Sequence, residues 1–394
     1  MGSLFQVNAL NKKKERFKIL FILDNPLSEW KGTQKMVYEL GLHLMRKGNE
    51  VVLIERNHVT EYSLKREIKA PFKIISIDFN ILSSFLIIKK WVKELKPDLI
   101  YSSNIINPLI PLIGTKTIFG SHVLNVTSLP YLKIREKMTF YFKQTILVLT
   151  SFFFWPNKNV MFHTLNLDQT NWIRRIYFGR YAIETIGNPI NCPEQDIAQI
   201  IKEKNKGKKF RILFFGAIDA SRGFSSFMKI VQLISNDSIM DKIEFLIAGS
   251  GTMEHEARSM VQEFKNVRFL YKPDEDQKKS LFLNSELFLF LSYIENFSIT
   301  TVEAQLYGIP AIISNTTPLL NIVEDKRTGY SFPPFGSEDS IVEKIKELVT
   351  LWEIDFEAYR EMSEYTAETS RRLCKENVLP IMERMITKFV RNQS

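Results

Sequence analysis

The chain has 394 residues, of which 45% are hydrophobic and 25% are charged, and this composition is that of a soluble globular protein. Its length exceeds what one ordinary hydrophobic core supports and predicts two domains of about 180 residues each. Its two cysteines, Cys192 and Cys374, are too few for a disulfide framework and lack metal-ligand spacing, which suits a reducing compartment. The first residues lack a continuous apolar signal core, so we expect a cytoplasmic location.

Charge is distributed unevenly along the chain. Residues 1–190 hold 27 Lys and Arg against 14 Asp and Glu, a net charge of +13, whereas residues 191–394 hold 26 against 30, a net charge of −4. A basic first half predicts a polyanionic neighbour, which is an anionic membrane, a nucleic acid or a phosphorylated acceptor. Because this half carries no recognised nucleic-acid-binding motif, we expect no nucleic-acid partner.

The first half alternates strand-like and helix-like segments. Residues 17–23 are a short apolar run that ends at a turn and indicates a buried strand, residues 33–46 have helical spacing, and residues 51–54 indicate a second strand. A strand, a helix and a strand at this spacing form a βαβ unit and predict a parallel sheet. Further strands are predicted at 73–78, 98–102, 159–164 and 182–186, with a helix at 82–95 between the first two.

A polar, lysine-rich stretch at 188–209 is typical of an interdomain linker, and a second series follows it. Strands are predicted there at 210–215, 243–248, 267–270 and 287–291. We therefore predict an α/β fold with two Rossmann-like domains, 1–188 and 189–376, facing each other across a cleft. Ligands of such folds bind at the carboxyl ends of the strands.

The most informative segment follows the predicted strand 287–291. Glu295–Phe297 lie in the loop at its carboxyl end, and Ser298 can cap the next helix. The backbone amides of Ile299 and Thr300 are then free to hold phosphate oxygens.

Glu303 lies on the apolar face of this helix, beside Ile299, Val302 and Leu306. A buried acid is costly unless a partner satisfies it, and a pair of ligand hydroxyls would do so. The alternative is an acid near a helix N-terminus that the helix dipole favours.

The segment from Glu295 to Pro310 resembles the Glu-x7-Glu signature of glycosyltransferase family 4, whose members are retaining enzymes of the GT-B type. The resemblance implies that Glu295 lies by the donor sugar and that Glu303 holds the ribose hydroxyls. It also implies that the loop between them grips the diphosphate. The donor-binding residues expected in this loop are Asn296, Phe297, Ser298, Ile299 and Thr300.

Residues 215–223 are similar to the family's Gly-Arg-Leu…Lys-Gly stretch, whose two cations bind the diphosphate. Gly216 matches its first glycine, and Arg222 takes the place of the lysine, since a guanidinium grips phosphate at least as well. Ala217 replaces the arginine, so one cation is missing. This departure supports the alternative of a non-catalytic GT-B module that binds a nucleotide sugar and partners another transferase.

Resemblance extends to three further stretches. Lys31-Gly32-Thr33 is similar to the glycine loop that opens the first helix, so Gly32 and Thr33 are expected near the donor. His122 falls where many members carry a histidine near the transferred sugar, although a histidine after a strand can also be structural. The final helices, 358–388, resemble a tail that crosses back to the first domain, and we place the crossing at about 377–394.

Three stretches have plainer interpretations. Asp274-Glu275-Asp276 spells a metal-binding motif of another glycosyltransferase fold, but its position favours helix capping. Gly249-Ser250-Gly251 indicates a strand-to-helix turn near the donor base. Residues 138–157 are too short and polar at their ends to span a bilayer; flanked by basic residues, they indicate either a membrane-interface segment or a buried helix.

The resemblance implies a retaining, metal-independent glycosyltransferase without a cofactor. Its donor is a nucleotide-diphosphate sugar, and Glu295 and His122 are the expected catalytic residues. Its acceptor is a glycan or a lipid-linked molecule, in the synthesis of a surface polysaccharide, a glycolipid or a glycoprotein glycan. The basic first half adds an anionic membrane as a partner and a peripheral place on its inner face.

Overall fold

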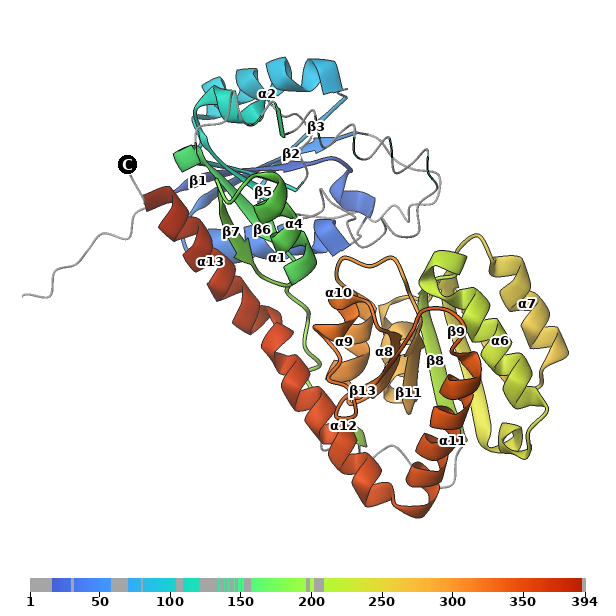
Figure 1. Cartoon of the computed structure of the whole chain (residues 1–394). Helices are drawn as coiled ribbons and strands as arrows, with labels where there is room; N and C mark the ends of the chain where they lie inside the picture. The colour runs from blue at the N-terminus through green and yellow to red at the C-terminus, as the bar shows by residue number, and fades with distance from the viewer. Residues whose placement is uncertain are drawn as a thin grey trace, which may run out of the picture.

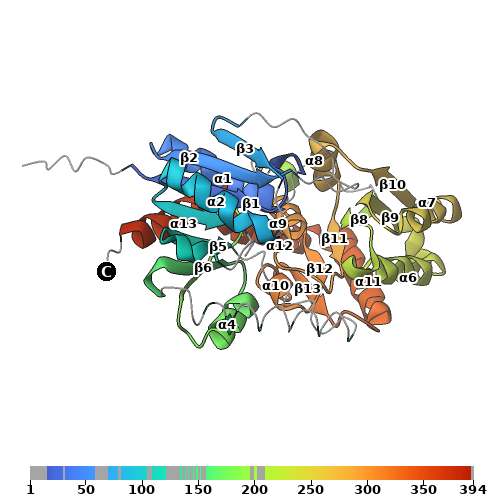
Figure 2. The same cartoon turned by 90° about the horizontal axis from the view of Figure 1, so that it is seen from above.

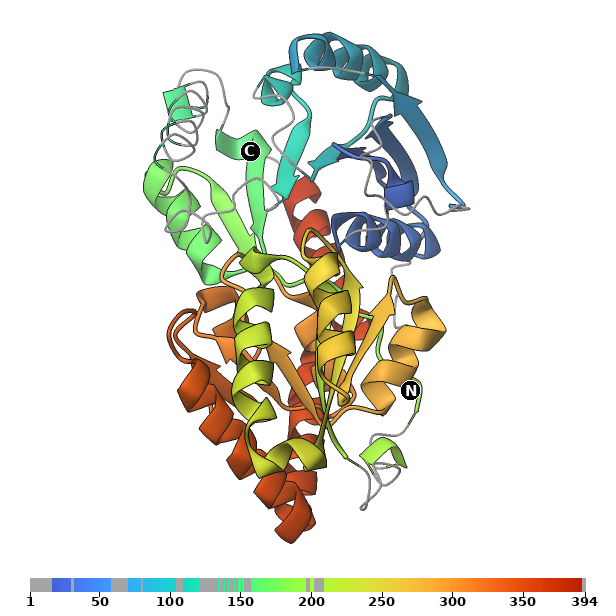
Figure 3. The same ribbon diagram turned by 90° about the vertical axis from the view of Figure 1, so that its right-hand side faces the viewer.

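The computed structural model describes residues 16–29, 32–57, 70–78, 81–103, 109–120, 157–195, 199–201 and 209–391, and seven single residues between 134 and 151. These residues build two α/β units, each around one parallel sheet (Figures 1 and 3). The predicted fold of two Rossmann-like domains is confirmed. No helix among the described residues has both the length and the apolarity needed to cross a bilayer.

The first sheet has seven parallel strands, and the five inner ones are largely buried because apolar residues occupy most of their positions. In chain order they are β1 (Lys18–Leu23), β2 (Glu50–Arg56), β3 (Lys73–Ile77), β4 (Leu99–Ser102), β5 (Lys116–Gly120), β6 (Val160–Thr164) and β7 (Ala182–Thr185). Their order across the sheet is β3-β2-β1-β4-β5-β6-β7.

Helices cover both faces of this sheet. On one face, α1 (Gly32–Arg46) and the C-terminal α13 (Lys375–Arg391) share a core with β1 and β2. On the other face, α2 (Ile81–Leu95) packs on the same strands, and α4 (Leu167–Ile176) lies beside β6. The last helix of the chain therefore belongs to the core of the first domain, and the predicted crossing back is confirmed (Figure 1).

The second sheet has six parallel strands in the order β10-β9-β8-β11-β12-β13. They are β8 (Phe210–Ala217), β9 (Ile243–Ser250), β10 (Val267–Tyr271), β11 (Leu287–Phe290), β12 (Ala311–Ser314) and β13 (Gly329–Phe332). The helices around them are α6 (Phe224–Ser235), α7 (Glu254–Glu263), α8 (Glu275–Leu283), α9 (Ile299–Leu306), α10 (Thr317–Leu320), α11 (Glu338–Ile354) and α12 (Phe356–Ser370).

The strand order of each sheet reverses at one point, between β1 and β4 in the first domain and between β8 and β11 in the second. Loops on either side of such a point diverge and leave a crevice at the carboxyl ends of the strands, where ligands bind. The functional residues predicted in the second domain follow β8 and β11, so its topology brings them to one crevice.

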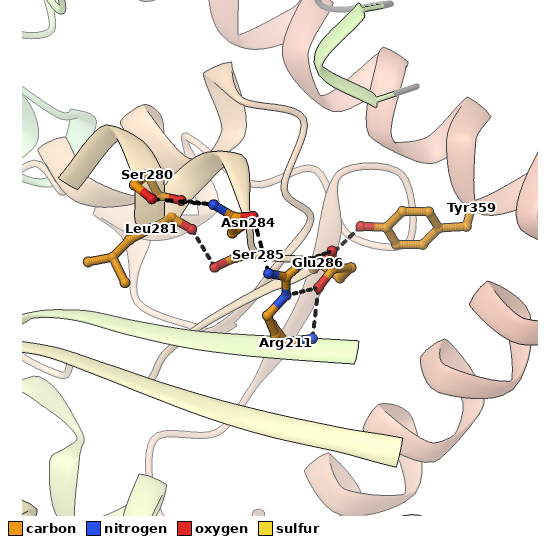
Figure 4. Close-up of polar contacts among 7 residues, drawn as sticks. All are labelled: Arg211, Ser280, Leu281, Asn284, Ser285, Glu286 and Tyr359. Carbon is orange, nitrogen blue, oxygen red and sulfur yellow. Dashed lines mark hydrogen bonds and ion pairs between the residues drawn. The ribbon is translucent and has the colours of Figure 1, made fainter. Parts of the chain in front are cut away.

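A polar network fixes the opposite end of β8 and β11 (Figure 4). The buried carboxylate of Glu286 accepts a hydrogen bond from the backbone nitrogen of Arg211 at 2.8 Å and lies 3.4 Å from its guanidinium. The hydroxyl of Tyr359 donates to the Glu286 carbonyl at 2.7 Å and so joins α12 to the sheet. A fully paired buried charge of this kind holds the two strands in register away from the crevice.

The chain crosses between the domains twice, and the two crossings touch. Ile190 donates to the carbonyl of Leu373 at 3.0 Å, and Lys375 donates to the carbonyl of Ile190 at 2.7 Å. Next to this contact Cys192 and Cys374 form a disulfide, with Cα atoms 5.5 Å apart. The sequence alone did not predict this pairing, because the two cysteines are separated by 182 residues and meet only where the two crossings touch.

Candidate functional site

The site begins at the carboxyl end of β8, where a short turn of residues 220–222 precedes α6. Gly223 ends this turn at φ 82° and lies so close to the end of β11 that a Cβ there would be 2.4 Å from the Leu291 carbonyl oxygen. Only glycine combines this conformation with this approach. Gly223 therefore holds the side chain of Arg222 against the loop that follows β11.

Arg222 forms an ion pair with Glu295 across the crevice. The same guanidinium nitrogen donates to the Ile294 carbonyl at 2.6 Å, and the Glu295 side chain is only 10% exposed. Burial raises the pKa of Glu295, an effect that the Arg222 guanidinium partly offsets. Arg222 and Glu295, which follow the neighbouring strands β8 and β11, thus form an ion pair that is largely shielded from solvent.

Helix α9 begins in the same loop and points its N-terminus into the crevice. The Ser298 hydroxyl accepts from the Thr301 nitrogen at 3.4 Å, which confirms the predicted cap and commits that hydroxyl to the helix. Gly32, the first residue of α1, lies opposite, and a Cβ on it would be 2.9 Å from Ile299 Cδ1. The N-termini of two helices from different domains therefore face one another, an arrangement that favours a bound anion.

Glu303 lies one turn further along α9 and has a cationic partner. The Lys278 ammonium donates to Glu303 Oε1 at 2.8 Å and contacts Glu275 Oε2 at 2.9 Å. Burial by itself lowers the pKa of Lys278, but the two carboxylates outweigh it and the pKa is raised. The acid on the apolar face is thus satisfied by a lysine that sequence patterning did not identify.

A cavity of about 550 Å³ opens beside Glu303 between the two domains. Its walls come from α1, from the linker at 189–194, from α8 and from α9, and Figure 2 shows these helices next to one another. Arg222 and Glu295 do not line it. The cavity therefore adjoins Glu303 but does not reach the Arg222–Glu295 ion pair.

The loop between Glu295 and α9 is fixed by the first domain. The Asn166 amide donates to the Asn296 carbonyl at 2.8 Å. The ring of Phe297 packs against Gly187 and Leu373, where a Cβ on Gly187 would be 2.8 Å from Phe297 Cε2. The Phe297 side chain thus faces the interdomain crossing, and the loop depends on both domains for its position.

The predicted site residues fall into two groups: those that the structure places around the crevice, to which Glu303 on α9 belongs, and those that lie outside the described residues. The structure brings together Gly216, Arg222, the loop from Glu295 to Thr300, and Gly32 with Thr33 at the start of α1. Lys31 and His122 lie outside the described residues, as does most of 138–157. Asp274 accepts from the Gln277 nitrogen in a capping box, which confirms its predicted capping role.

Sequence reasoning missed Asn166 and Lys278. Asn166 also caps α4 by accepting from the Gln169 nitrogen at 2.9 Å, and that role is visible in sequence as an Asn before a helix. Its second hydrogen bond, to a residue 130 positions away, has no local signal. The same holds for Lys278, whose partner Glu303 lies 25 positions away on another helix.

Comparisons with known proteins bear on the second domain and on the fold. Residues 196–369 match the family model described as glycosyl transferases group 1. An uncharacterized 41.2 kDa protein in the cps region of Klebsiella pneumoniae is 26% identical over 46% of this chain and 50% of its own length, so the match spans about half of that relative.

Two solved structures share the fold over nearly the whole chain. A glycosyltransferase from Rickettsia africae superposes with a TM-score of 0.71 and 13% identity, covering 96% of this chain and 100% of that one. Alr3699/HepE of Anabaena, in complex with UDP and glucose, superposes with a TM-score of 0.65 and 12% identity, covering 96% and 100%. Together with the two-sheet architecture, these findings show a second domain that matches the glycosyl transferases group 1 model over residues 196–369, in a chain with the two-Rossmann-domain fold of GT-B glycosyltransferases.

Proposed function

We propose that this protein is a retaining glycosyltransferase similar to family 4, which transfers a sugar from a nucleotide-diphosphate donor to an acceptor. The observation that carries the proposal is the contact between Arg222 and Glu295 at the point where the strand order of the second sheet reverses. A diphosphate needs a cation and free amides, and a sugar needs an acid within hydrogen-bond reach. The N-terminus of α9 and Glu303 supply the rest of a nucleotide site.

In this proposal each residue has one task. Arg222 and the amides of Ile299 and Thr300 hold the diphosphate and stabilise the charge that develops as it leaves. Glu295 positions the transferred sugar, and Glu303 binds the ribose hydroxyls. The leaving phosphate takes the proton of the acceptor hydroxyl, and the new bond forms on the face from which the phosphate departs, so that no protein nucleophile is required. His122 is proposed to act beside the transferred sugar.

Calorimetry with UDP, GDP and ADP in the presence of EDTA tests the donor site. We expect one of them to bind without a metal ion, since a guanidinium and helix amides carry the phosphate charge. An Arg222→Met variant should bind that nucleotide more weakly, whereas Arg327→Met, which removes an exposed arginine of the same domain, should not. If wild-type protein binds none of the three, or binds only when a metal ion is added, the proposed donor site is wrong.

The acceptor is proposed to be a glycan or a lipid-linked molecule at an anionic membrane, in the synthesis of a surface polysaccharide, a glycolipid or a glycoprotein glycan. Residues 1–190 have a net charge of +13. Ile134 and Met138, each in helical conformation, are 79% and 68% exposed. Exposed apolar residues among basic ones suit the interface of an anionic bilayer, and this supports a peripheral place on its inner face.

Sedimentation with vesicles of phosphatidylglycerol and phosphatidylcholine tests this placement. Binding should require the anionic lipid, weaken with salt, and weaken further when Ile134 and Met138 are both replaced by serine. The matched control is Ile354→Ser, which removes an 80% exposed isoleucine from the second domain. Equal recovery in the supernatant with neutral and anionic vesicles would contradict the membrane proposal while leaving the donor site untouched.

One observation favours a second function, a non-catalytic module that binds a nucleotide sugar for a partner transferase. Ala217 stands where the family carries an arginine, and the remaining cation, Arg222, is paired with Glu295. A site with reduced positive charge stabilises a leaving diphosphate less. Donor hydrolysis distinguishes the two functions, because an active transferase releases sugar slowly to water whereas a binding module returns the donor intact.

A further inference from the structure

The residues that surround Glu303 form a chain of alternating charges across the domain interface. Lys35 of α1 lies 3.9 Å from Glu275 at the start of α8, Glu275 contacts Lys278, and Lys278 donates to Glu303 of α9. The exposed fractions of the side chains fall from 53% at Glu275 to 16% at Lys278 and 14% at Glu303. The chain of charges therefore runs from solvent into the wall of the interdomain cavity and ends at the carboxylate beside the donor site.

The geometry at Glu303 is asymmetric. Its Oε1 accepts the Lys278 hydrogen bond at 2.8 Å, whereas Oε2 accepts no hydrogen bond from any residue that the structure describes. One oxygen thus anchors the carboxylate, and the other remains for a ligand. A glutamate side chain has three rotatable bonds, and fixing them in advance removes an entropy cost from ligand binding.

Its surroundings keep the lysine in place. Phe282 of α8, the helix that carries Lys278, stacks at 5.5 Å on Tyr307, the residue that ends α9, and both rings line the same cavity. Glu275 holds the ammonium from the preceding turn of α8. Lys278 is thereby confined by an acid on each side and cannot swing away without leaving Glu303 unpaired.

We propose that Lys278 is a positioning residue for nucleotide binding: it orients the carboxylate of Glu303 toward the ribose hydroxyls, and Glu275 holds it in place. This inference rests on the proposed function, because it needs a nucleotide ribose at Glu303. It adds a lysine on α8 and an anchoring acid to the site, and it assigns them an action through Glu303 without contact to the reacting sugar.

The test compares binding of a nucleoside diphosphate with binding of its 2′,3′-dideoxy analogue by calorimetry. Wild-type protein should prefer the ribose form, because only that form offers hydroxyls to Glu303. Lys278→Met should weaken binding of the ribose form about tenfold, because one charge-assisted hydrogen bond network is lost. The affinity for the dideoxy form should stay nearly unchanged. Lys278→Arg should restore most of the preference. Lys242→Met, which removes an exposed lysine paired with Glu353 elsewhere in the domain, is the matched control.

A double-mutant cycle separates positioning from general support of the fold. In a Glu303→Gln background, Lys278→Met should have little further effect on ribose preference. If Lys278→Met weakens both nucleotide forms equally, or if its effect adds fully to that of Glu303→Gln, the inference is overturned. If the preference for the ribose form depends on Glu303 but not on Lys278, the inference is overturned and the proposed function still stands. Failure of wild-type protein to bind any nucleotide would overturn both.

Discussion

The side-chain amide of Asn166 in the first domain donates to the backbone carbonyl of Asn296 in the second, across 2.8 Å. Asn166 is 3% exposed, and its oxygen caps α4 at the same time. The loop that carries Glu295 is therefore held from the opposite domain by one buried side chain with two roles.

Replacing Asn166 separates these roles. Asn166→Ser keeps a capping hydroxyl but is too short to reach Asn296, whereas Asn166→Ala loses both. We expect both variants to weaken nucleotide binding about fivefold, equivalent to about 1 kcal/mol for a lost hydrogen bond. Only the alanine variant should lose about 1 kcal/mol more in the free energy of unfolding, from the missing cap. Calorimetry and urea titration measure the two effects, and wild-type affinity in both variants would contradict the link between the domains.

Glu303 and Glu295 should differ in the kinetic parameter they control. A ribose contact acts alike in the ground and transition states, so Glu303→Ala should mainly raise KM for the donor. A group at the transferred sugar can act more strongly in the transition state, so Glu295→Ala should mainly lower kcat. Each loss should be about 1.5–3 kcal/mol, as for a charge-assisted hydrogen bond. Steady-state kinetics with the opposite division would exchange the two roles.

The disulfide between Cys192 and Cys374 should be detectable in protein purified under oxidising conditions. Peptide mapping without reductant should yield one linked peptide pair. Because the bond joins residues 182 positions apart, its reduction should lower the free energy of unfolding by about 2–5 kcal/mol. Cys374→Ser protein should lack this response to a thiol reductant. Two free thiols in unreduced wild-type protein would show that the bond does not form.

Because His163 is buried in the first domain, we expect the stability of this domain to fall at acid pH. It is buried between the Tyr101 hydroxyl, 2.6 Å from Nδ1, and the Ile186 carbonyl, 2.8 Å from Nε2, and burial lowers its pKa to about 4. The unfolded chain binds this proton near pH 6.5, so the contribution of neutral His163 is complete above that pH and is lost as the pH falls toward 4.

The loss should reach about 3 kcal/mol, the equivalent of the pKa difference. Denaturant titrations from pH 7 to pH 4.5 should show a steeper fall in stability for wild-type protein than for His163→Gln. His255→Gln, at an exposed position on α7, should retain the wild-type slope. Parallel curves for wild-type and His163→Gln would show that the histidine titrates normally.

The sequence predicts the fold well where apolar runs are long. The strand at 210–215 is recognisable because its residues are nearly all apolar, and it lies within the eight-residue β8. β5, β12 and β13 were not predicted. β5 (KTIFG) and β13 (GYSF) mix apolar residues with glycine and polar residues, so neither forms a continuous apolar run. Their place in the sheets is settled by pairing with neighbours that are distant in sequence.

The candidate site divides in a similar way. Arg222, Glu295 and Glu303 could be predicted from the sequence because each lies in a short local segment with a characteristic spacing. Arg222 belongs to the turn after β8, and Glu295 and Glu303 belong to the loop and helix after β11. The roles of Lys278 and Asn166 could not be predicted from the sequence, because each residue meets its partner only through the packing of separate elements. The pairing of Cys192 with Cys374 depends on how α12 and α13 return the chain to the linker, which no local pattern encodes.

The contact between the two crossings limits how the domains can move. Ile190 is hydrogen-bonded on both sides to the returning chain, at Leu373 and Lys375, so both connections pass through one small region. Two bodies joined at one such region cannot slide apart or past each other without breaking these bonds, but they can still swing about it. We therefore expect the crevice to open for donor entry by a rotation about the region near residue 190, with the largest displacement at the far rim of the cleft.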